Sequence, residues 1–193
     1  MDRLNFRWLL PAAVLALGLA AVAAVLLLAP PKPSAGPGIG GPFALTAQDG
    51  RIMTQADFAG APFLVFFGYT HCPDVCPTTL FDVSQIFARL GKDRKIAAAF
   101  ISVDPERDTP AVMKEFMASF DPRMVALSGP PEALQPVLKA YRVYAKKVAG
   151  KDGDYTMDHT ALVYLMDKNG RFVSSFNTGQ TPEAAAKELA GYF

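Results

Sequence analysis

Cysteine and histidine are scarce in this chain, which has two of each among its 193 residues. Cys72 and Cys76 lie four positions apart, and a disulfide that closes so short a loop stabilises a fold only weakly. A reactive or metal-binding role therefore explains them better than a structural bridge. The chain also lacks an excess of charge of either sign. Without Arg3, Arg7 and Asp2, the 19 basic and 18 acidic side chains become 17 of each. The basic excess that nucleic-acid binding calls for is absent, and we expect no nucleic-acid partner.

A long uncharged stretch lies near the N-terminus. Trp8–Ala29 contains 22 residues and no charge, and a helix of that length spans roughly 33 Å, enough to cross a bilayer. Arg3 and Arg7 precede it in a stub of residues 1–7, and basic flanks stay in the cytoplasm. We expect a retained single-pass transmembrane anchor in a bacterial inner membrane, with the remaining chain in the periplasm. A cleaved signal peptide is the alternative, although its apolar core would be only roughly 7–15 residues long and Pro30 is a poor cleavage context.

Residues 30–42 separate this apolar stretch from the rest of the chain. They include five prolines and four glycines in 13 residues, a composition that cannot form a packed core and is typical of a linker. The folded domain is therefore expected over residues 43–193.

Apolar runs and helical periodicities alternate through this domain. Residues 43–46 and 51–53 flank a turn and predict a β-hairpin. The remaining strands are expected at 61–67, 95–103, 124–127, 161–166 and 172–176, and the helices after Pro77, after Pro110, at 131–141 and at 183–190. Residues 144–148 are expected to be extended, and residues 150–158 to form a polar loop. Strands that alternate with helices predict a layered α/β sandwich.

Both cysteines lie in the stretch Phe66–Pro77, and each precedes a proline. Proline disfavours helical backbone in the residue before it and suits the first position of a helix. We therefore predict a helix that begins at Pro77 with Cys76 as its cap. The partial positive charge of the helix N-terminus would then favour a Cys76 thiolate. Two thiolates on one turn can close a disulfide, hold a soft metal, or remain buried and inert.

A cysteine pair between the first core strand and its helix is the layout of a thioredoxin-like fold, with the site at the carboxyl end of that strand. In such a sheet the loop before strand 161–166, which contains His159, faces the cysteine loop. Cys72, Cys76 and His159 can therefore converge. Two thiolates and an imidazole suit copper, whereas zinc normally takes a fourth ligand. A thioredoxin-type reductase would instead carry Cys-x-x-Cys and a facing proline, and this sequence has neither.

Other polar residues receive structural interpretations. His71 is expected to point away from the site, because adjacent residues in an extended chain point apart. We expect Asp158 to be a cap or a hydrogen-bond acceptor that supports the ligands, and Asp74 to occupy a turn. Turn chemistry explains the composition of Asp104–Pro110. The seven methionines are not clustered, so a methionine-rich copper surface is not expected.

The blocks Gly68–Pro77, Ser102–Pro110 and Asp158–Thr160, in this order behind an apolar N-terminal stretch, resemble the SCO/SenC family. The resemblance covers the domain from about Phe43 onward. It implies a membrane-tethered, thioredoxin-like, three-layer α/β protein. It further implies a copper metallochaperone that carries Cu(I) or Cu(II) to the dinuclear copper site of cytochrome c oxidase subunit II.

Carried over onto this sequence, the family's copper ligands fall on Cys72, Cys76 and His159. We expect a binding protein rather than an enzyme, which passes copper on by ligand exchange. The alternative is a thiol–disulfide oxidoreductase that keeps the copper-ligand cysteines of the oxidase reduced and does not need His159. A peroxiredoxin-like peroxidase fits less well, because no arginine lies near Cys72. Besides subunit II, other periplasmic copper chaperones and thiol–disulfide reductases are candidate partners.

Overall fold

The computed structural model describes residues 38–150 and 153–193. The predicted stub, the predicted anchor and the linker through residue 37 lie outside the described residues. Among the helices of the described ranges, none is long and apolar enough to cross a membrane. Residues 38–42 of the predicted linker already contact the domain, because Ile39 packs against its core and the Gly40 N–H donates to the Ala140 carbonyl at 2.9 Å.

The described chain forms nine strands, four α-helices and one 3-10 helix. In chain order they are β1 (Ala44–Ala47), β2 (Ile52–Thr54), η1 (Gln55–Phe58), β3 (Phe63–Gly68), α2 (Val75–Leu90), β4 (Ala97–Ser102), α3 (Pro110–Met117), β5 (Met124–Ser128), α4 (Pro131–Ala140), β6 (Ala145–Ala149), β7 (Tyr155–His159), β8 (Val163–Met166), β9 (Phe172–Phe176) and α5 (Pro182–Ala190).

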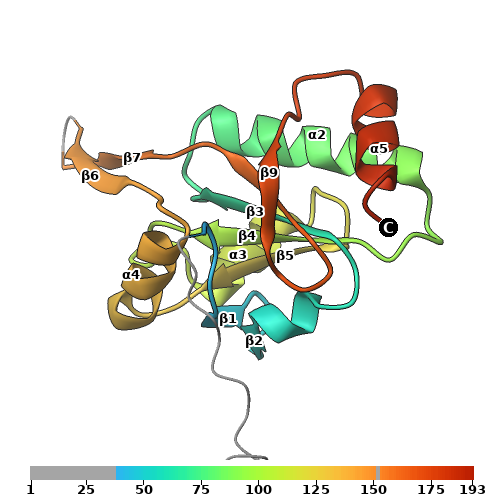
Figure 1. Ribbon diagram of the computed structural model, residues 1–193. Helices are drawn as coiled ribbons and strands as arrows, with labels where there is room; N and C mark the ends of the chain where they lie inside the picture. The colour runs from blue at the N-terminus through green and yellow to red at the C-terminus, as the bar shows by residue number, and fades with distance from the viewer. Residues whose placement is uncertain (1–37, 151–152) are drawn as a thin grey trace, which may run out of the picture. The chain divides into compact units, whose positions relative to one another are not determined.

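Seven of the strands form one mixed sheet in the order β2-β1-β5-β4-β3-β8-β9 (Figure 1). The central strands β3, β4 and β5 are parallel, whereas β8 and β9 continue the sheet antiparallel on one side and β1 and β2 on the other. The predicted N-terminal hairpin is therefore the edge β1–β2, which turns at Gly50 with a φ of +85°.

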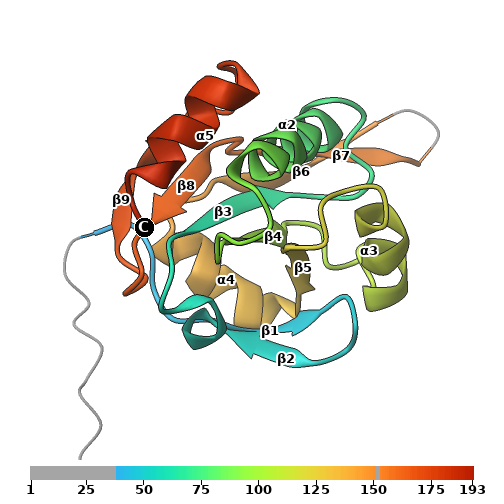
Figure 2. The same cartoon turned by 90° about the vertical axis from the view of Figure 1, so that its right-hand side faces the viewer.

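Helices cover both faces of this sheet. Figure 2 shows α2, α3 and α5 on one face and α4 on the other. The shared face of α2 and α3 follows from two successive right-handed crossovers, β3-α2-β4 and β4-α3-β5, which move across the sheet in the same direction. Both α3 and α5 begin with a threonine cap followed by proline, as Thr109 accepts from the Val112 N–H and Thr181 from the Ala184 N–H.

The strand that leads to the cysteines is the most enclosed. Every residue of β3 is buried, as expected of a strand with neighbours on both sides and helices on both faces. The Phe67 ring packs against Tyr141 and Tyr164, with ring centroids 5.3 and 6.1 Å apart. The end of β3 is thus a rigid base for the segment that follows it.

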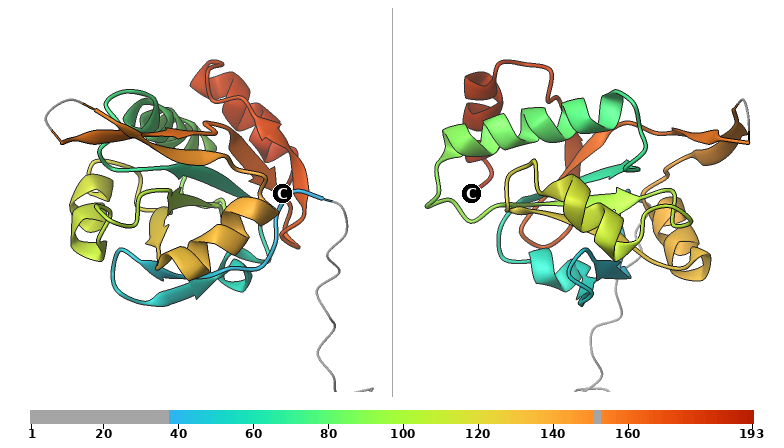
Figure 3. Two further views of the ribbon diagram at one scale, coloured as in Figure 1. Left: turned by 90° about the vertical axis from the view of Figure 1, so that its left-hand side faces the viewer. Right: turned by 180° about the vertical axis from the view of Figure 1, so that it is seen from behind.

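The predicted polar loop at residues 150–158 is wrong over residues 155–158, whereas residues 150, 153 and 154 do lie outside helices and strands and residues 151–152 lie outside the described residues. Tyr155–His159 is strand β7, which pairs antiparallel with β6 so that Ala145 faces His159. This hairpin extends beyond the main sheet, at the end where α2 begins (Figure 3). Because His159 is the last residue of β7, the hairpin decides where the imidazole lies.

Candidate metal centre

Helix α2 begins two residues earlier than predicted. Asp74 is its N-cap and Cys76 lies in the first turn, so the expectation that Cys76 caps a helix starting at Pro77 is wrong. Proline is tolerated here because the first four N–H groups of a helix have no partner within the helix. The Cys76 N–H instead donates to the Cys72 sulfur over 3.4 Å. The helix N-terminus therefore faces the Cys72 sulfur.

The Cys76 sulfur lies in a space that only glycine leaves open. Cys76 is fully buried, and a Cβ added at Gly68 would lie 2.7 Å from its sulfur and 2.7 Å from the Phe100 ring. Both cysteines are free thiols, and Cys72 is only 8% exposed. Because Gly68 has no side chain, the Cys76 sulfur can lie in the buried space at the end of β3.

Burial also changes the acidity of the Cys76 thiol. Desolvation raises the pKa of Cys76 well above its usual range, and the hydrogen bond from the Tyr69 backbone only partly opposes this. Burial therefore opposes the stabilisation of a Cys76 thiolate that the helix N-terminus is expected to provide. A metal that binds this sulfur must displace its proton, as metal binding to thiols generally does.

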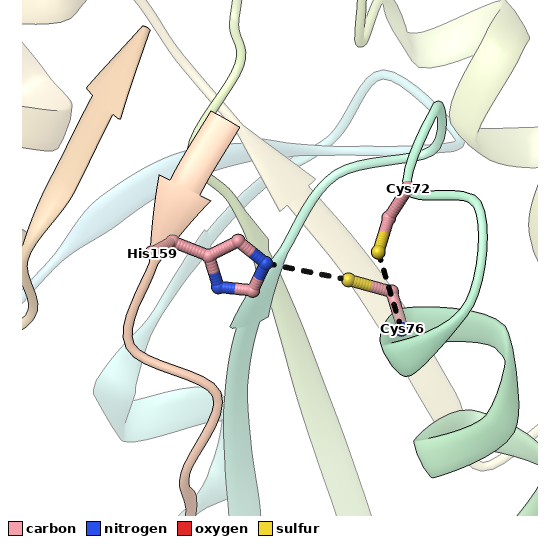
Figure 4. Close-up of side chains that lie close together, drawn as sticks. All are labelled: Cys72, Cys76 and His159. Carbon is pink, nitrogen blue, oxygen red and sulfur yellow. Dashed lines mark hydrogen bonds between the residues drawn. The ribbon is translucent and has the colours of Figure 1, made fainter. Parts of the chain in front are cut away.

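His159 brings an imidazole to the sulfurs from strand β7. Its Nε2 lies 3.6 Å from the Cys76 sulfur (Figure 4), and its Nδ1 lies 3.1 Å from the Thr160 carbonyl. We assign the proton of the neutral ring to Nδ1, because only a donor satisfies that carbonyl. The lone pair of Nε2 is then directed toward the two sulfurs.

The ring of Tyr69 supports the imidazole from the side. Tyr69 is 3% exposed, and its ring meets that of His159 edge to face at a centroid distance of 5.7 Å. Asp158, expected to cap or support the ligands, is exposed on the other face of β7, and the recorded partner of the His159 Nδ1 is backbone. His71 is exposed and contacts the Thr70 hydroxyl at 3.0 Å.

The three predicted ligands converge. The sulfurs of Cys72 and Cys76 and a ring nitrogen of His159 all lie within 4.8 Å of one another, and the described part of the chain adds no fourth Cys, His, Asp or Glu to this group. Bonds of roughly 2.0–2.3 Å to nitrogen and sulfur would let one ion reach all three atoms with small shifts. Two soft sulfurs and one imidazole, with no fourth ligand, favour copper over zinc.

Sequence reasoning missed two buried carboxylates next to this group. Asp104 and Asp108 are 2% and 1% exposed, although their segment reads as an exposed turn. Asp108 accepts from the Thr70 hydroxyl at 2.6 Å, from the Thr70 N–H at 3.2 Å, and from the Ser102 hydroxyl. Burial raises the pKa of Asp108, and the hydrogen bonds from Ser102 and Thr70 oppose that rise. Asp108 thereby ties the segment before Cys72 to the end of β4.

Fold and site together define a class of protein: a thioredoxin-like α/β domain with a Cys–Cys–His cluster at the carboxyl end of its central strand. Residues 31–193 match the SCO1/SenC family, and the chain belongs to that family. The resemblance drawn from the three sequence blocks is therefore confirmed.

Known proteins resemble the chain over most of its length. The structure of Bradyrhizobium japonicum ScoI with copper bound is 60% identical, with a TM-score of 0.78, and the match covers 81% of this chain and 100% of that one. Protein SenC of Rhodobacter capsulatus is 40% identical over 159 residues, covering 81% of this chain and 71% of that protein. The mitochondrial SCO1 homolog 1 of Arabidopsis thaliana is 36% identical over 167 residues. That match covers 83% of this chain but 50% of the plant protein, so the chain spans about half its length. The thioredoxin-like α/β fold is thus confirmed.

Replacing Gly68 with alanine tests the packing of the buried sulfur. The added methyl group would collide with the Cys76 sulfur and the Phe100 ring, so we expect a loss of about 1–3 kcal/mol in the free energy of unfolding. Urea denaturation of the reduced protein measures it. Gly38→Ala is the matched control, because an added Cβ there has no atom within 4 Å, and it should change stability by less than about 0.5 kcal/mol. Equal stability of the two variants would show that the sulfur is not confined.

Proposed function

We propose that this protein is a membrane-tethered copper metallochaperone. It binds one copper ion through Cys72, Cys76 and His159 and delivers it to the dinuclear copper site of cytochrome c oxidase subunit II. The observation that carries the proposal is the convergence of two sulfurs and one imidazole nitrogen within 4.8 Å. Copper bound to the Bradyrhizobium relative, at 60% identity, supports the choice of metal.

The three ligands differ in how firmly the fold holds them. Cys76 is fully buried in the first turn of α2, whereas His159 ends a hairpin outside the main sheet and is half-buried. The cysteine sulfurs provide soft ligands that hold copper. Transfer then proceeds by ligand exchange, in which the imidazole leaves first and a partner's ligand takes its place.

The proposal predicts that His159 and His71 behave differently. In a Cu(I) titration of the reduced protein against a chromophoric chelator, His159→Ala should weaken binding at least about 100-fold. Loss of a ligand should lower the copper affinity more than loss of a residue that only supports a ligand, which lowers metal affinity roughly 10- to 100-fold. His71→Ala, the matched control, should leave the affinity unchanged within about twofold. Unchanged affinity in His159→Ala would remove the imidazole from the site and contradict the proposed metal centre.

The alternative function is thiol–disulfide exchange, in which the protein reduces the copper-ligand cysteines of the oxidase. The observation that favours it is the pair of free sulfurs at one helix N-terminus. The Cys72 thiolate would attack the partner disulfide, and Cys76 would then displace the partner's second thiolate. Two electrons pass to the partner, which takes up two protons, and Cys72–Cys76 becomes a disulfide.

This alternative makes its own prediction for the three site residues. Single-turnover reduction of a disulfide-bonded peptide, followed by mass spectrometry, should depend on Cys72 and Cys76. His159→Ala should retain the rate within about threefold, because an imidazole is not required for exchange between a thiolate and a disulfide. A reductase that loses its activity with His159→Ala would contradict the expected division of roles. No peptide reduction by the unmodified protein would exclude the alternative.

We further infer that residues 8–29 anchor the protein in a bacterial inner membrane and that the domain lies in the periplasm. Residues 30–42 would be the linker, of which Ile39 and Gly40 already contact the domain. The support for the anchor is the uncharged length of residues 8–29 and the position of Arg3 and Arg7 before them. Alkaline phosphatase fused after Phe193 should be active in cells, because it requires export. The fusion should also remain in the membrane fraction after alkaline extraction with its full mass. A product shortened by about 29 residues would instead identify a cleaved signal peptide.

A further inference from the structure

The hairpin that carries His159 is not held by the main sheet. In the described chain, β6 and β7 pair only with each other, and Figure 1 shows the hairpin extending away from the sheet. Sheet hydrogen bonds therefore do not determine how close His159 comes to the cysteines. Other contacts must hold its Nε2 3.6 Å from the Cys76 sulfur.

Strand β7 turns alternate side chains toward the domain. Tyr155, Met157 and His159 are half-buried, whereas Thr156 and Asp158 are exposed, as the alternation of a strand requires. Met157 packs against the hydrophobic core. Tyr155 thus shares its face with His159, and at roughly 3.4 Å per residue it lies about 14 Å from it along the strand.

Tyr155 is tied to the loop that follows β4. Its hydroxyl donates to Asp104 Oδ1 at 2.8 Å, and Asp104 Oδ2 accepts from Arg107 Nε at 2.6 Å. Hydrogen bonds to a charged partner are roughly twice as strong as neutral ones. Desolvation, with Asp104 contributing, raises the pKa of Tyr155 to about 12, so its hydroxyl remains a donor at neutral pH.

Arg107 fastens the same strand by two further contacts. Its guanidinium carbon lies 3.6 Å from the centroid of the Tyr155 ring, and its Nη1 donates to the Tyr155 carbonyl at 3.0 Å. It also lies 5.7 Å from the centroid of the Tyr69 ring, which touches His159. By contrast, the pair of Lys147 and Glu106 is exposed, and exposed pairs contribute little.

We propose that Asp104, Arg107 and Tyr155 form a latch that positions His159 for the cysteine pair. Tyr155 and Arg107 are positioning residues, since in the structure they touch neither sulfur. The latch sets the fraction of molecules in which Nε2 faces the sulfurs, and the apparent copper affinity scales with that fraction. The inference rests on the proposed role of His159 as a copper ligand.

The decisive variant is Tyr155→Phe, which removes the hydroxyl bonded to Asp104 and keeps the ring beneath Arg107. In the full chain, titrated with Cu(I) against a chromophoric chelator, Tyr155→Phe should weaken binding about tenfold, the lower end of the effect of a residue that orients a ligand. In the His159→Ala background the same change should alter the affinity by less than about twofold. This dependence on His159 distinguishes positioning from a general loss of structure.

A second measurement needs no metal. In the reduced, metal-free protein, the nuclear Overhauser effect between the ring protons of Tyr69 and His159 reports the position of the imidazole. It should weaken at least about twofold in Tyr155→Phe and remain unchanged in Tyr144→Phe, a control at an exposed tyrosine just before β6. Arg107→Lys keeps the charge but loses the planar fork, and it should show the same loss if Tyr155→Phe does not fold.

The outcomes separate this inference from the proposed function. The latch would be overturned if Tyr155→Phe weakened copper binding equally in the unmodified and His159→Ala proteins. It would also be overturned if Tyr155→Phe changed neither the affinity in either protein nor the Overhauser effect between Tyr69 and His159. If His159→Ala itself binds copper normally, the proposed site fails, and the ring contact alone then decides whether the latch positions His159.

Discussion

Two buried carboxylates in the segment between β4 and α3 hold the site together. Burying a charged group is costly unless hydrogen bonds compensate for the lost water. Asp104 and Asp108 therefore need their hydrogen-bond donors, and this requirement holds the donor residues in place. Asp108 accepts a hydrogen bond from the hydroxyl of Thr70, next to the cysteine loop, and Asp104 accepts one from the hydroxyl of Tyr155 in the hairpin. Cys76 and His159 are 83 residues apart in the chain. The segment that follows β4 thus supports both the cysteine loop and the hairpin that carries His159.

The site is asymmetric in depth, and this has consequences for copper exchange. Cys76 lies deepest, in the space left by Gly68, whereas Cys72 is slightly exposed and His159 half-buried. Under the proposed function, a partner's ligands approach from the side of Cys72 and His159, and Cys76 is the last to let the ion go. A ligand held by a latched hairpin can be displaced without unfolding the cysteine loop, because the hairpin shares no sheet hydrogen bonds with β3.

The sequence predicts the layered fold and the meeting of Cys72, Cys76 and His159, because buried strands and the position of the cysteine pair are local signals. The sequence does not predict the start of a helix correctly where a local preference is satisfied at several neighbouring positions. Proline is tolerated throughout the unpaired first turn of a helix, so Pro77 does not mark where α2 begins. Strand β7 has a recognisable signal in the alternation of Tyr155, Met157 and His159 with polar residues, which the polar composition of the neighbouring loop concealed. Asp104 reads as a turn residue, because its partner Tyr155 lies 51 positions further along the chain.

The three sequence blocks that carry the family resemblance meet at one set of contacts. The first supplies Gly68 and both sulfurs, the second Asp104 and Asp108, and the third His159. A copper carrier and a dithiol reductase both need the first two blocks, so the imidazole distinguishes them. Burial raises the pKa of Cys76, which would slow the step in which Cys76 displaces the partner's second thiolate, whereas a cation can replace its proton. Under the proposed function, a lone pair of His159 directed at that same sulfur completes a copper site with three ligands. Under the alternative, the imidazole takes no part in the exchange.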